Sequence, residues 1–302
     1  MWLQPGGDRL RQKGLGKGIM VSDFLTPGGR LAYTKNGNDV FATHYHEYSK
    51  DNYWTGDMMV KHALEKMLPI FETAFPPDRF QGLFLFDNAT NHCAMADDAL
   101  VANRMNLNSG GQKPLMRDGV NPLTNSPHQM WQWAGSNKEP KGIRVILKER
   151  GLWPLNRRLR LECLLKTDHT EDHQCCARRL LASQPDFKNQ KGVLAEELEK
   201  RGHLVMFYPK FHPELNFIEY YWGAAKRYAR ENCEYNIVGL RLTIPRALQS
   251  VAVPTIGKFY QRTIRSTEAY QDGCKLGTEE YKHRVYRSHR RVCSVRKHCG
   301  ES

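Results

Sequence analysis

Two acidic residues, Asp87 and Glu219, are the best candidates for catalysis in this chain. Asp87 follows the apolar run QGLFLF at residues 81–86, which predicts a strand buried on both faces. Open α/β sheets bind ligands at the carboxyl ends of such strands. Glu219 lies one turn into a predicted helix that follows a second apolar run, at residues 203–208. The two carboxylates could hold one or two divalent cations for in-line phosphodiester chemistry. The residues alone also allow a structural role, in which Asp87 caps a turn and Glu219 pairs with a basic residue of its own helix.

Alternating strand and helix patterns surround these acids and predict an α/β fold. Residues 18–25 predict a strand. Thr55 is predicted to cap a helix whose last turn is kinked at Pro69, and Asn216 to cap another helix that begins near Phe217. The apolar face of the first helix repeats at helical spacing and comprises Met59, Ala63, Met67, Ile70 and Phe71.

The composition is that of a folded, basic protein. The 302 residues are 40% hydrophobic and 10% aromatic, which supports a packed core and excludes wholesale disorder. No apolar run approaches the ~20 residues that span a bilayer, and the first residues lack the apolar segment of a secretory signal. A formal net charge of +13 favours a polyanionic partner such as nucleic acid. The eight cysteines are irregularly spaced, which favours reduced thiols.

The pattern changes between the two acids. A helix is predicted at about residues 94–105. Residues 106–142 are rich in Gly, Pro, Asn and Ser and show neither helical nor strand periodicity, which predicts a long surface loop. A helix with Leu194 and Leu198 facing inward is predicted before the strand at residues 203–208.

The sequences around both acids resemble the motifs of mariner-type DDE transposases. FDNATNH at residues 86–92 is similar to the family's second-acid motif, a strand followed by Asp-Asn-Ala-x-x-His. YPKFHPELNFIEYYW at residues 208–222 is similar to the third-acid motif, which ends in Ile-Glu-x-x-Trp with a basic residue one turn on, here Lys226. The resemblance covers about residues 14–102 and 190–232.

The resemblance implies a ribonuclease-H-like α/β fold, in which helices flank a mixed sheet, with a long loop-rich insertion and a helical, basic C-terminal tail. The implied domains are residues 1–105 for the first part of the catalytic domain and residues 106–185 for the insertion. Residues 186–232 would form the last strand and the catalytic helix, and residues 233–302 the tail.

The implied ancestral reaction is DNA strand cleavage and transfer that depends on Mg²⁺ or Mn²⁺. Asp87 and Glu219 would be the second and third metal ligands of a DDE endonuclease. His92 would orient the loop or a phosphate, and Trp222 would pack the catalytic helix on the sheet. The supporting residues of the two motifs are Asn88, His92, Asn216, Trp222 and Lys226.

One departure from the family pattern affects the chemistry. The first Asp of the family lies on a strand upstream of the one predicted at residues 18–25, so the chain resembles an N-terminally truncated member. Asp23 is the nearest substitute as a metal ligand. Loss of one ligand is expected to remove most phosphoryl-transfer activity. The alternative function is therefore a non-catalytic remnant, or a co-opted protein, that binds DNA without cutting it.

The C-terminal residues supply a candidate DNA-binding surface. Residues 281–298 contain seven basic residues and no acidic one, which favours contacts with a phosphate backbone, although a solvated terminus is the alternative. The predicted contacts are Lys282, Arg284, Arg287, Arg290 and Arg291. These basic clusters and the resemblance predict a nuclear protein, and the resemblance allows a homo-oligomer.

A second metal site is a weaker candidate. Thiol and imidazole side chains gather within 14 residues of the insertion, and these ligand types could close a tetrahedral Zn²⁺ site. The candidate ligands are Cys163, His169, His173, Cys175 and Cys176. Their spacing fits no standard zinc motif, so an incidental polar loop is the alternative.

Overall fold

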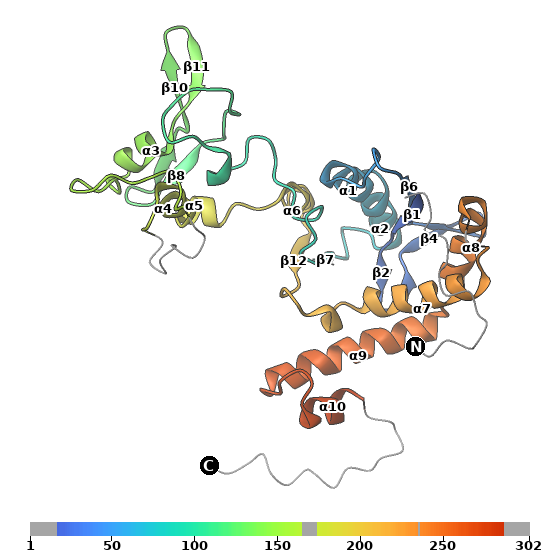
Figure 1. Cartoon of the computed structure of the whole chain (residues 1–302). Coiled ribbons are helices and arrows are strands. Elements are labelled where there is room, and N and C mark those ends of the chain that lie inside the picture. Colours follow the sequence, from blue (N-terminus) through green and yellow to red (C-terminus); the bar gives the residue numbers. More distant parts are fainter. Residues whose placement is uncertain (1–16, 165–173, 235, 287–302) are drawn as a thin grey trace, which may run out of the picture. The chain divides into compact units, whose positions relative to one another are not determined.

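The structure is a computed structural model that describes residues 17–164, 174–234 and 236–286 (Figure 1). The chain divides into two compact units. Unit 1 consists of the described residues up to His92 and from Leu198 onward, and unit 2 is Cys93–Glu197. The expected mixture of helices and strands with a helical C-terminal region is confirmed.

Unit 1 begins with antiparallel strands. Strand β1 (Gly18–Ser22) pairs with β6 (His44–Tyr48), so the predicted strand at residues 18–25 ends at Ser22. Two short hairpins lie between them along the chain and consist of β2 (Leu25–Thr26), β3 (Gly29–Arg30), β4 (Ala32–Lys35) and β5 (Asn38–Phe41).

The predicted helix that follows is present but is interrupted. Thr55 caps α1 (Gly56–His62) by accepting a hydrogen bond from the Met58 amide. A wider π turn (Ala63–Met67) then leads into α2 (Leu68–Ala74), whose second residue is Pro69. Proline lacks an amide hydrogen, and its ring collides with the preceding helical turn, so a kink was predicted at Pro69. In the structure the widened π turn before Pro69 relieves this clash.

Strand β7 (Leu83–Phe86) pairs in parallel with β12 (Leu204–Phe207). The last residues that pair are Phe86 and Phe207. The prediction that β7 is buried on both faces is wrong. Phe84 and Phe86 are buried, but Leu83 and Leu85 are 50% and 43% exposed. Only one face of this strand pair is covered by other residues of unit 1. A continuous apolar run does not indicate which face of the strand will be covered.

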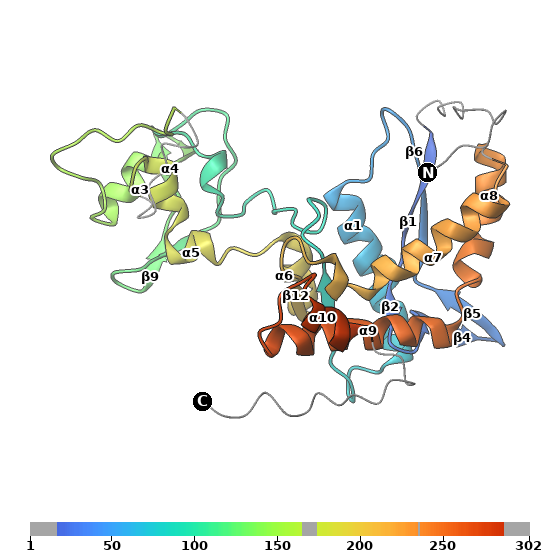
Figure 2. The same ribbon diagram turned by 60° about the horizontal axis from the view of Figure 1, so that its bottom comes forward.

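The C-terminal part of unit 1 is helical. Helix α7 (Phe217–Asn232) begins at the predicted residue and contacts α8 (Ile237–Gln249) and α9 (Val253–Gln271). Figures 1 and 2 both show α7 and α9 side by side. The last helix, α10 (Glu279–Val285), packs on α9. Tyr221 of α7 is fully buried in the core between α7, α8 and α9, where its hydroxyl donates to the Leu248 carbonyl.

The expected single mixed sheet is not formed among the described residues. Their strands instead form six separate pairs, of which only β7–β12 is parallel. The predicted ribonuclease-H-like sheet is therefore present at most as its component pairs.

Unit 2 is more ordered than its composition predicts. The predicted helix at residues 94–105 is wrong, because only a 3₁₀ turn (Ala102–Arg104) forms there. The expected irregular loop at residues 106–142 contains two hairpins, β8 (Gly119–Asn121) with β9 (Ser126–His128) and β10 (Trp131–Ala134) with β11 (Asn137–Pro140). The second hairpin extends away from the helices of unit 2 (Figure 1).

The helices of unit 2 are short and pack around one apolar core. They are α3 (Ile143–Glu149), α4 (Ala177–Ala182), α5 (Pro185–Lys188) and α6 (Val193–Glu199), the last of which ends in unit 1. Leu194 and Leu198 of α6 are fully buried, as predicted. The ends of unit 2 meet, because the Val193 amide donates to the Ala94 carbonyl at 2.8 Å.

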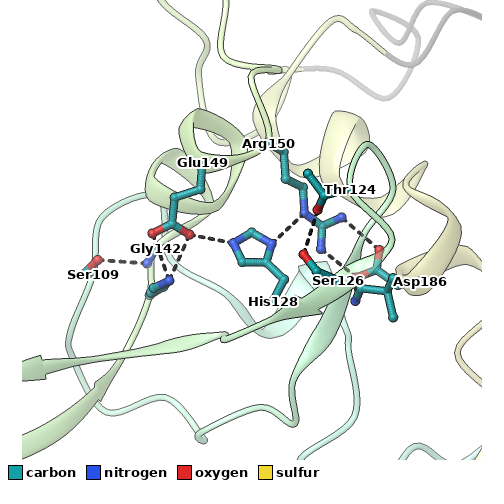
Figure 3. A network of polar contacts seen from close by, with 10 residues as sticks. Ser109, Thr124, Ser126, His128, Gly142, Glu149, Arg150 and Asp186 are labelled. Atoms are coloured by element: carbon teal, nitrogen blue, oxygen red, sulfur yellow. Dashed lines mark hydrogen bonds and ion pairs between the residues drawn. The ribbon is translucent and has the colours of Figure 1, made fainter.

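A buried polar network connects helices α3 and α5 to the β8–β9 hairpin (Figure 3). The fully buried Arg150 donates through both terminal nitrogens to Asp186, at 2.9 and 2.6 Å. Its Nε donates to His128 Nδ1, so the His128 Nε2 carries the hydrogen that reaches Glu149 at 2.6 Å. Gly119 is required beside this network, since a Cβ there would lie 2.3 Å from an Asp186 oxygen.

Candidate functional site

Asp87 and Glu219 line the same pocket of unit 1, although residues 88–218 separate them along the chain. The pocket has a volume of about 410 Å³. It lies where β7 and β12 end and α7 begins. Its lining residues are Asp87, Asn88, Tyr208, Pro209, Lys210, Phe211, His212, Pro213, Asn216 and Glu219.

The position of Asp87 follows from the parallel strand pair. The Tyr208 amide donates to the Phe86 carbonyl at 2.8 Å, and Asn88 Nδ2 donates to the Tyr208 carbonyl, so the two strand ends are joined. Asp87 Oδ1 accepts from the Ala89 amide at 2.9 Å, as in a turn cap. The contacts of this carboxylate with described residues fall on Oδ1, which leaves Oδ2 for a ligand.

His92 holds the Asp87 carboxylate in place. Its Nδ1 lies 2.6 Å from Asp87 Oδ1, and its ring packs 5.3 Å from that of Phe86. Because the carboxylate oxygen accepts, Nδ1 carries the hydrogen in this contact. The resemblance assigned His92 to the loop or to a phosphate, and in the structure its hydrogen bond goes to the first of the two pocket acids.

Glu219 lies in the first turn of α7 and is exposed. No described residue forms an ion pair or hydrogen bond with its carboxylate, so the alternative pairing with Lys226 or Arg230 is not made. Asn216 and Glu219 have the spacing of a capping box, but neither side chain caps the helix. Asn216 therefore occupies the predicted cap position without the predicted side-chain bond, and both side chains remain available to the pocket.

The other supporting residues lie along α7. Trp222 packs in the core between α7, α8 and α9, with its ring 5.1 Å from that of Tyr221. Lys226 is exposed and follows Glu219 by seven residues, so it lies two turns on along the same helix face. A cation two turns from the carboxylate on that face can contact a bound polyanion.

Two pocket residues were not singled out from the sequence. Phe211 has a backbone φ of 67°, which is costly for a residue with a side chain, and its ring is 93% exposed. Lys210 lines the pocket beside it. An exposed aromatic ring next to a lysine is the combination that binds single nucleic-acid strands by stacking and charge. The Lys-Phe pair within the third-acid motif was the available signal.

A nearby third carboxylate is not free for a ligand. Glu214 Oε1 accepts hydrogen bonds from Tyr270 and from His212, the latter at 2.8 Å. Burial alone would raise the pKa of Glu214, but these two donors outweigh burial and lower it. Glu214 therefore stays ionised and bound within the protein.

Asp23, the predicted substitute for the first acid, lies outside the pocket lining. It follows β1, its side chain is fully buried, and its Oδ2 accepts from Arg30 Nε at 2.8 Å. Burial raises the pKa of Asp23, and the neighbouring Arg30 only partly opposes the rise. Asp87 and Glu219 thus line one pocket, and Asp23 is held in a separate ion pair.

The remaining predicted residues lie elsewhere. Lys282 and Arg284 are on α10, where they pair with Glu279 and Asp272. Cys163, Cys175 and Cys176 come together in unit 2. Arg287, Arg290, Arg291, His169 and His173 lie outside the described residues.

Comparison with known proteins supplies no family. Neither the protein-family models, nor the curated proteins, nor the solved structures contain a match to this chain. Among the described residues, no helix has both the length and the apolar character needed to cross a membrane. The geometry of the pocket and the motifs that line it are therefore the features that bear on function.

Proposed function

We propose that the pocket of unit 1 is a divalent-cation site for phosphodiester chemistry on DNA, derived from a DDE transposase. The observation that carries this proposal is the convergence of Asp87 and Glu219 on one pocket. They come from a strand end and a helix start, the two places where the motif resemblance assigned metal ligands.

The donor set fits a hard cation such as Mg²⁺. The pocket offers carboxylate oxygens from Asp87 and Glu219 and amide oxygens from Asn88 and Asn216. Mg²⁺ prefers oxygen ligands and is commonly held by one or two carboxylates, with substrate phosphates and water completing its octahedron. A bound ion would polarise a phosphate oxygen and lower the pKa of a bound water.

The protein's own residues would position the substrate. His92 fixes the Asp87 carboxylate through the Oδ1 hydrogen bond. Lys210 and Lys226 can contact phosphates, and Phe211 can stack on a base exposed by strand distortion. The net charge of +13 favours capture of a polyanion in the same way.

A ribonuclease-H-like arrangement is part of this proposal. Two features support it, namely the antiparallel β1–β6 pair and the parallel β7–β12 pair with Asp87 at its carboxyl end. A mixed sheet of that type contains both kinds of pairing. Nuclear localisation and self-association remain predictions from the resemblance.

The test is a nicking assay on supercoiled DNA with Mg²⁺ or Mn²⁺, run beside Mn²⁺ titration of the full chain. We expect Glu219→Gln and Asp87→Asn each to lower cleavage and Mn²⁺ affinity at least about 100-fold, since loss of an outer partner of a ligand already costs 10–100-fold. Glu231→Gln is the matched control, because Glu231 is exposed on the same helix and lies outside the pocket lining. Cleavage that survives both pocket substitutions would overturn the proposal.

A second candidate function is DNA binding without cleavage. Two carboxylates line the pocket, while Asp23 and Glu214 are held by other side chains. The family pattern uses three acids, and loss of one ligand is expected to remove most phosphoryl-transfer activity. DNA binding that weakens with salt, together with no nicking by the wild-type chain, would favour this candidate.

A further inference from the structure

Three cysteines of unit 2 come together, and the proposed DNA chemistry does not use them. The sulfur atoms of Cys163, Cys175 and Cys176 all lie within 4.8 Å of one another. The Cys163 thiol is hydrogen-bonded to the other two. Partial burial, together with these neighbouring thiols, raises the pKa of Cys163 to about 11.

The backbone holds the cluster together from two segments of the chain. The Ala177 amide donates to the Arg160 carbonyl at 3.0 Å, and the Arg178 amide donates to the Leu161 carbonyl at 3.1 Å. These bonds place the segment that leads to the first cysteine against the start of α4. Cys176 occupies the N-cap position of α4 and is fully buried. The cluster is thus built into the edge of the unit 2 core and is not a chance meeting of loops.

The spacing suits one tetrahedral thiophilic ion. Zinc–sulfur bonds of ~2.3 Å in a tetrahedron put the sulfur atoms ~3.8 Å apart, so shifts of under ~1 Å would close the site. A disulfide would join only two of the three sulfurs at ~2.05 Å and leave the third without a role. No carboxylate or imidazole of the described residues joins the cluster, so the donors are soft.

We propose that Cys163, Cys175 and Cys176 bind one Zn²⁺ ion through three thiolates. Each thiol loses its proton on binding. The ion ties the segment before Cys163 to the first turn of α4. This is a structural centre for unit 2, and it is independent of the proposed cation site in unit 1.

The first measurement uses the unaltered full chain. Protein expressed with zinc and purified without chelator should contain about one zinc per chain by elemental mass spectrometry. Exchange with Co²⁺ should give the intense near-ultraviolet absorption of thiolate-to-cobalt charge transfer. A strong chelator should remove the metal and lower the melting temperature. Both wild-type measurements stand even if a variant fails to fold.

Variants then locate the ligands. Cys163→Ser and Cys175→Ser should each lose the zinc or weaken its binding at least tenfold. Cys274→Ser should keep it, because Cys274 packs beside α9 and α10 in unit 1. The proposal is overturned if the wild-type chain holds no zinc and shows no charge-transfer band with Co²⁺, if a disulfide within the cluster is found after anaerobic purification, or if zinc persists in both serine variants.

Discussion

Carboxylates in the polar network of unit 2 and in the pocket of unit 1 have opposite surroundings. In unit 2, Asp186 receives two hydrogen bonds from the buried Arg150, and Glu149 accepts from His128 and Lys141. In the pocket of unit 1, the Glu219 carboxylate contacts no described partner, and Asp87 engages only Oδ1.

This difference separates structural acids from acids available to a ligand. Burial alone would raise the pKa of Asp186, but the Arg150 guanidinium outweighs burial and lowers it. Asp23 and Glu214 also belong to unit 1, but both have partners. Asp23 is bound by Arg30, and Glu214 is bound by Tyr270 and His212. Partnership, and not position in the sequence, distinguishes the pocket acids from the rest.

The largest expected effect comes from breaking the unit 2 network. Arg150→Met should destabilise unit 2 by ~3–5 kcal/mol, because Asp186 is left as a buried charge without its partner. Chemical denaturation followed by circular dichroism measures the loss, and Arg158→Met at an exposed position is the control. Adding Asp186→Leu to Arg150→Met should restore part of the stability. If the free energy of unfolding of the Arg150→Met chain lies within 1 kcal/mol of the wild-type value, the Arg150–Asp186 pair does not have the structural role that the comparison assigns to it.

A pH titration should separate the two regions. Burial lowers the pKa of His62 in unit 1 from 6.5 to about 4, and its Nε2 donates to the Ala42 carbonyl. Between these values the unfolded chain binds a proton that the folded chain does not. The contribution of His62 to the free energy of unfolding should therefore fall by up to ~3 kcal/mol as the pH drops from 6.5 to 4. Asp186 and Glu149 have lowered pKa values, so their stabilisation is lost only as the pH falls below the unfolded values of 3.8 and 4.5.

Denaturation midpoints between pH 4 and pH 7.5 test this separation. His62→Gln should flatten the dependence above pH 4.5, since the glutamine amide can still donate to Ala42 but does not titrate. A profile that is unchanged in the variant would show that another group causes the dependence.

A smaller effect is expected from His92, a side chain that orients a pocket acid. His92→Leu should weaken Mn²⁺ binding by ~10–100-fold without unfolding the chain, because His92 positions Asp87 and lies outside the pocket lining. His92→Asn should recover much of the affinity, since its amide nitrogen can reach the same oxygen. Equal affinities for the leucine and asparagine variants would argue against a positioning role.

The smallest effect is expected for the stability of the chain when the pocket acid Glu219 is replaced. Glu219→Gln should change the free energy of unfolding by no more than ~0.5 kcal/mol, because the carboxylate has no described partner to lose. Chemical denaturation of the variant and of the wild-type chain, followed by circular dichroism, measures the difference. A loss above 1 kcal/mol would place Glu219 among the structural acids.

The sequence predicted the elements around the pocket better than those of unit 2. Helix α7 begins at Phe217 as expected, because Pro213 and Asn216 punctuate the chain before a strong apolar stripe. Strands β7 and β12 were recognisable as apolar runs. The exposure of Leu83 was not, since which face of a strand is covered depends on distant residues.

Unit 2 was predicted poorly for two physical reasons. The helix predicted at about residues 94–105 does not form, and Leu100 and Met105 are buried in the unit 2 core from a largely irregular stretch of chain. The hairpins of residues 119–140 have strands of three or four residues, which is too short for an alternating pattern to show. Pairings such as Arg150 with Asp186 are invisible to local patterns.

The parallel β7–β12 pair also sets the order in which the molecule can be made. On the ribosome, β7 emerges well before β12, and its hydrogen-bonding edge must wait while the whole of Cys93–Glu197 is translated. If that stretch becomes compact early, the hydrogen bond between Val193 and Ala94 shortens the effective loop between the two strands. A shorter loop lowers the entropic cost of pairing β7 with β12. The pocket can therefore assemble only after Cys93–Glu197 has been translated, and mutations that slow the folding of unit 2 should delay its appearance in nascent chains.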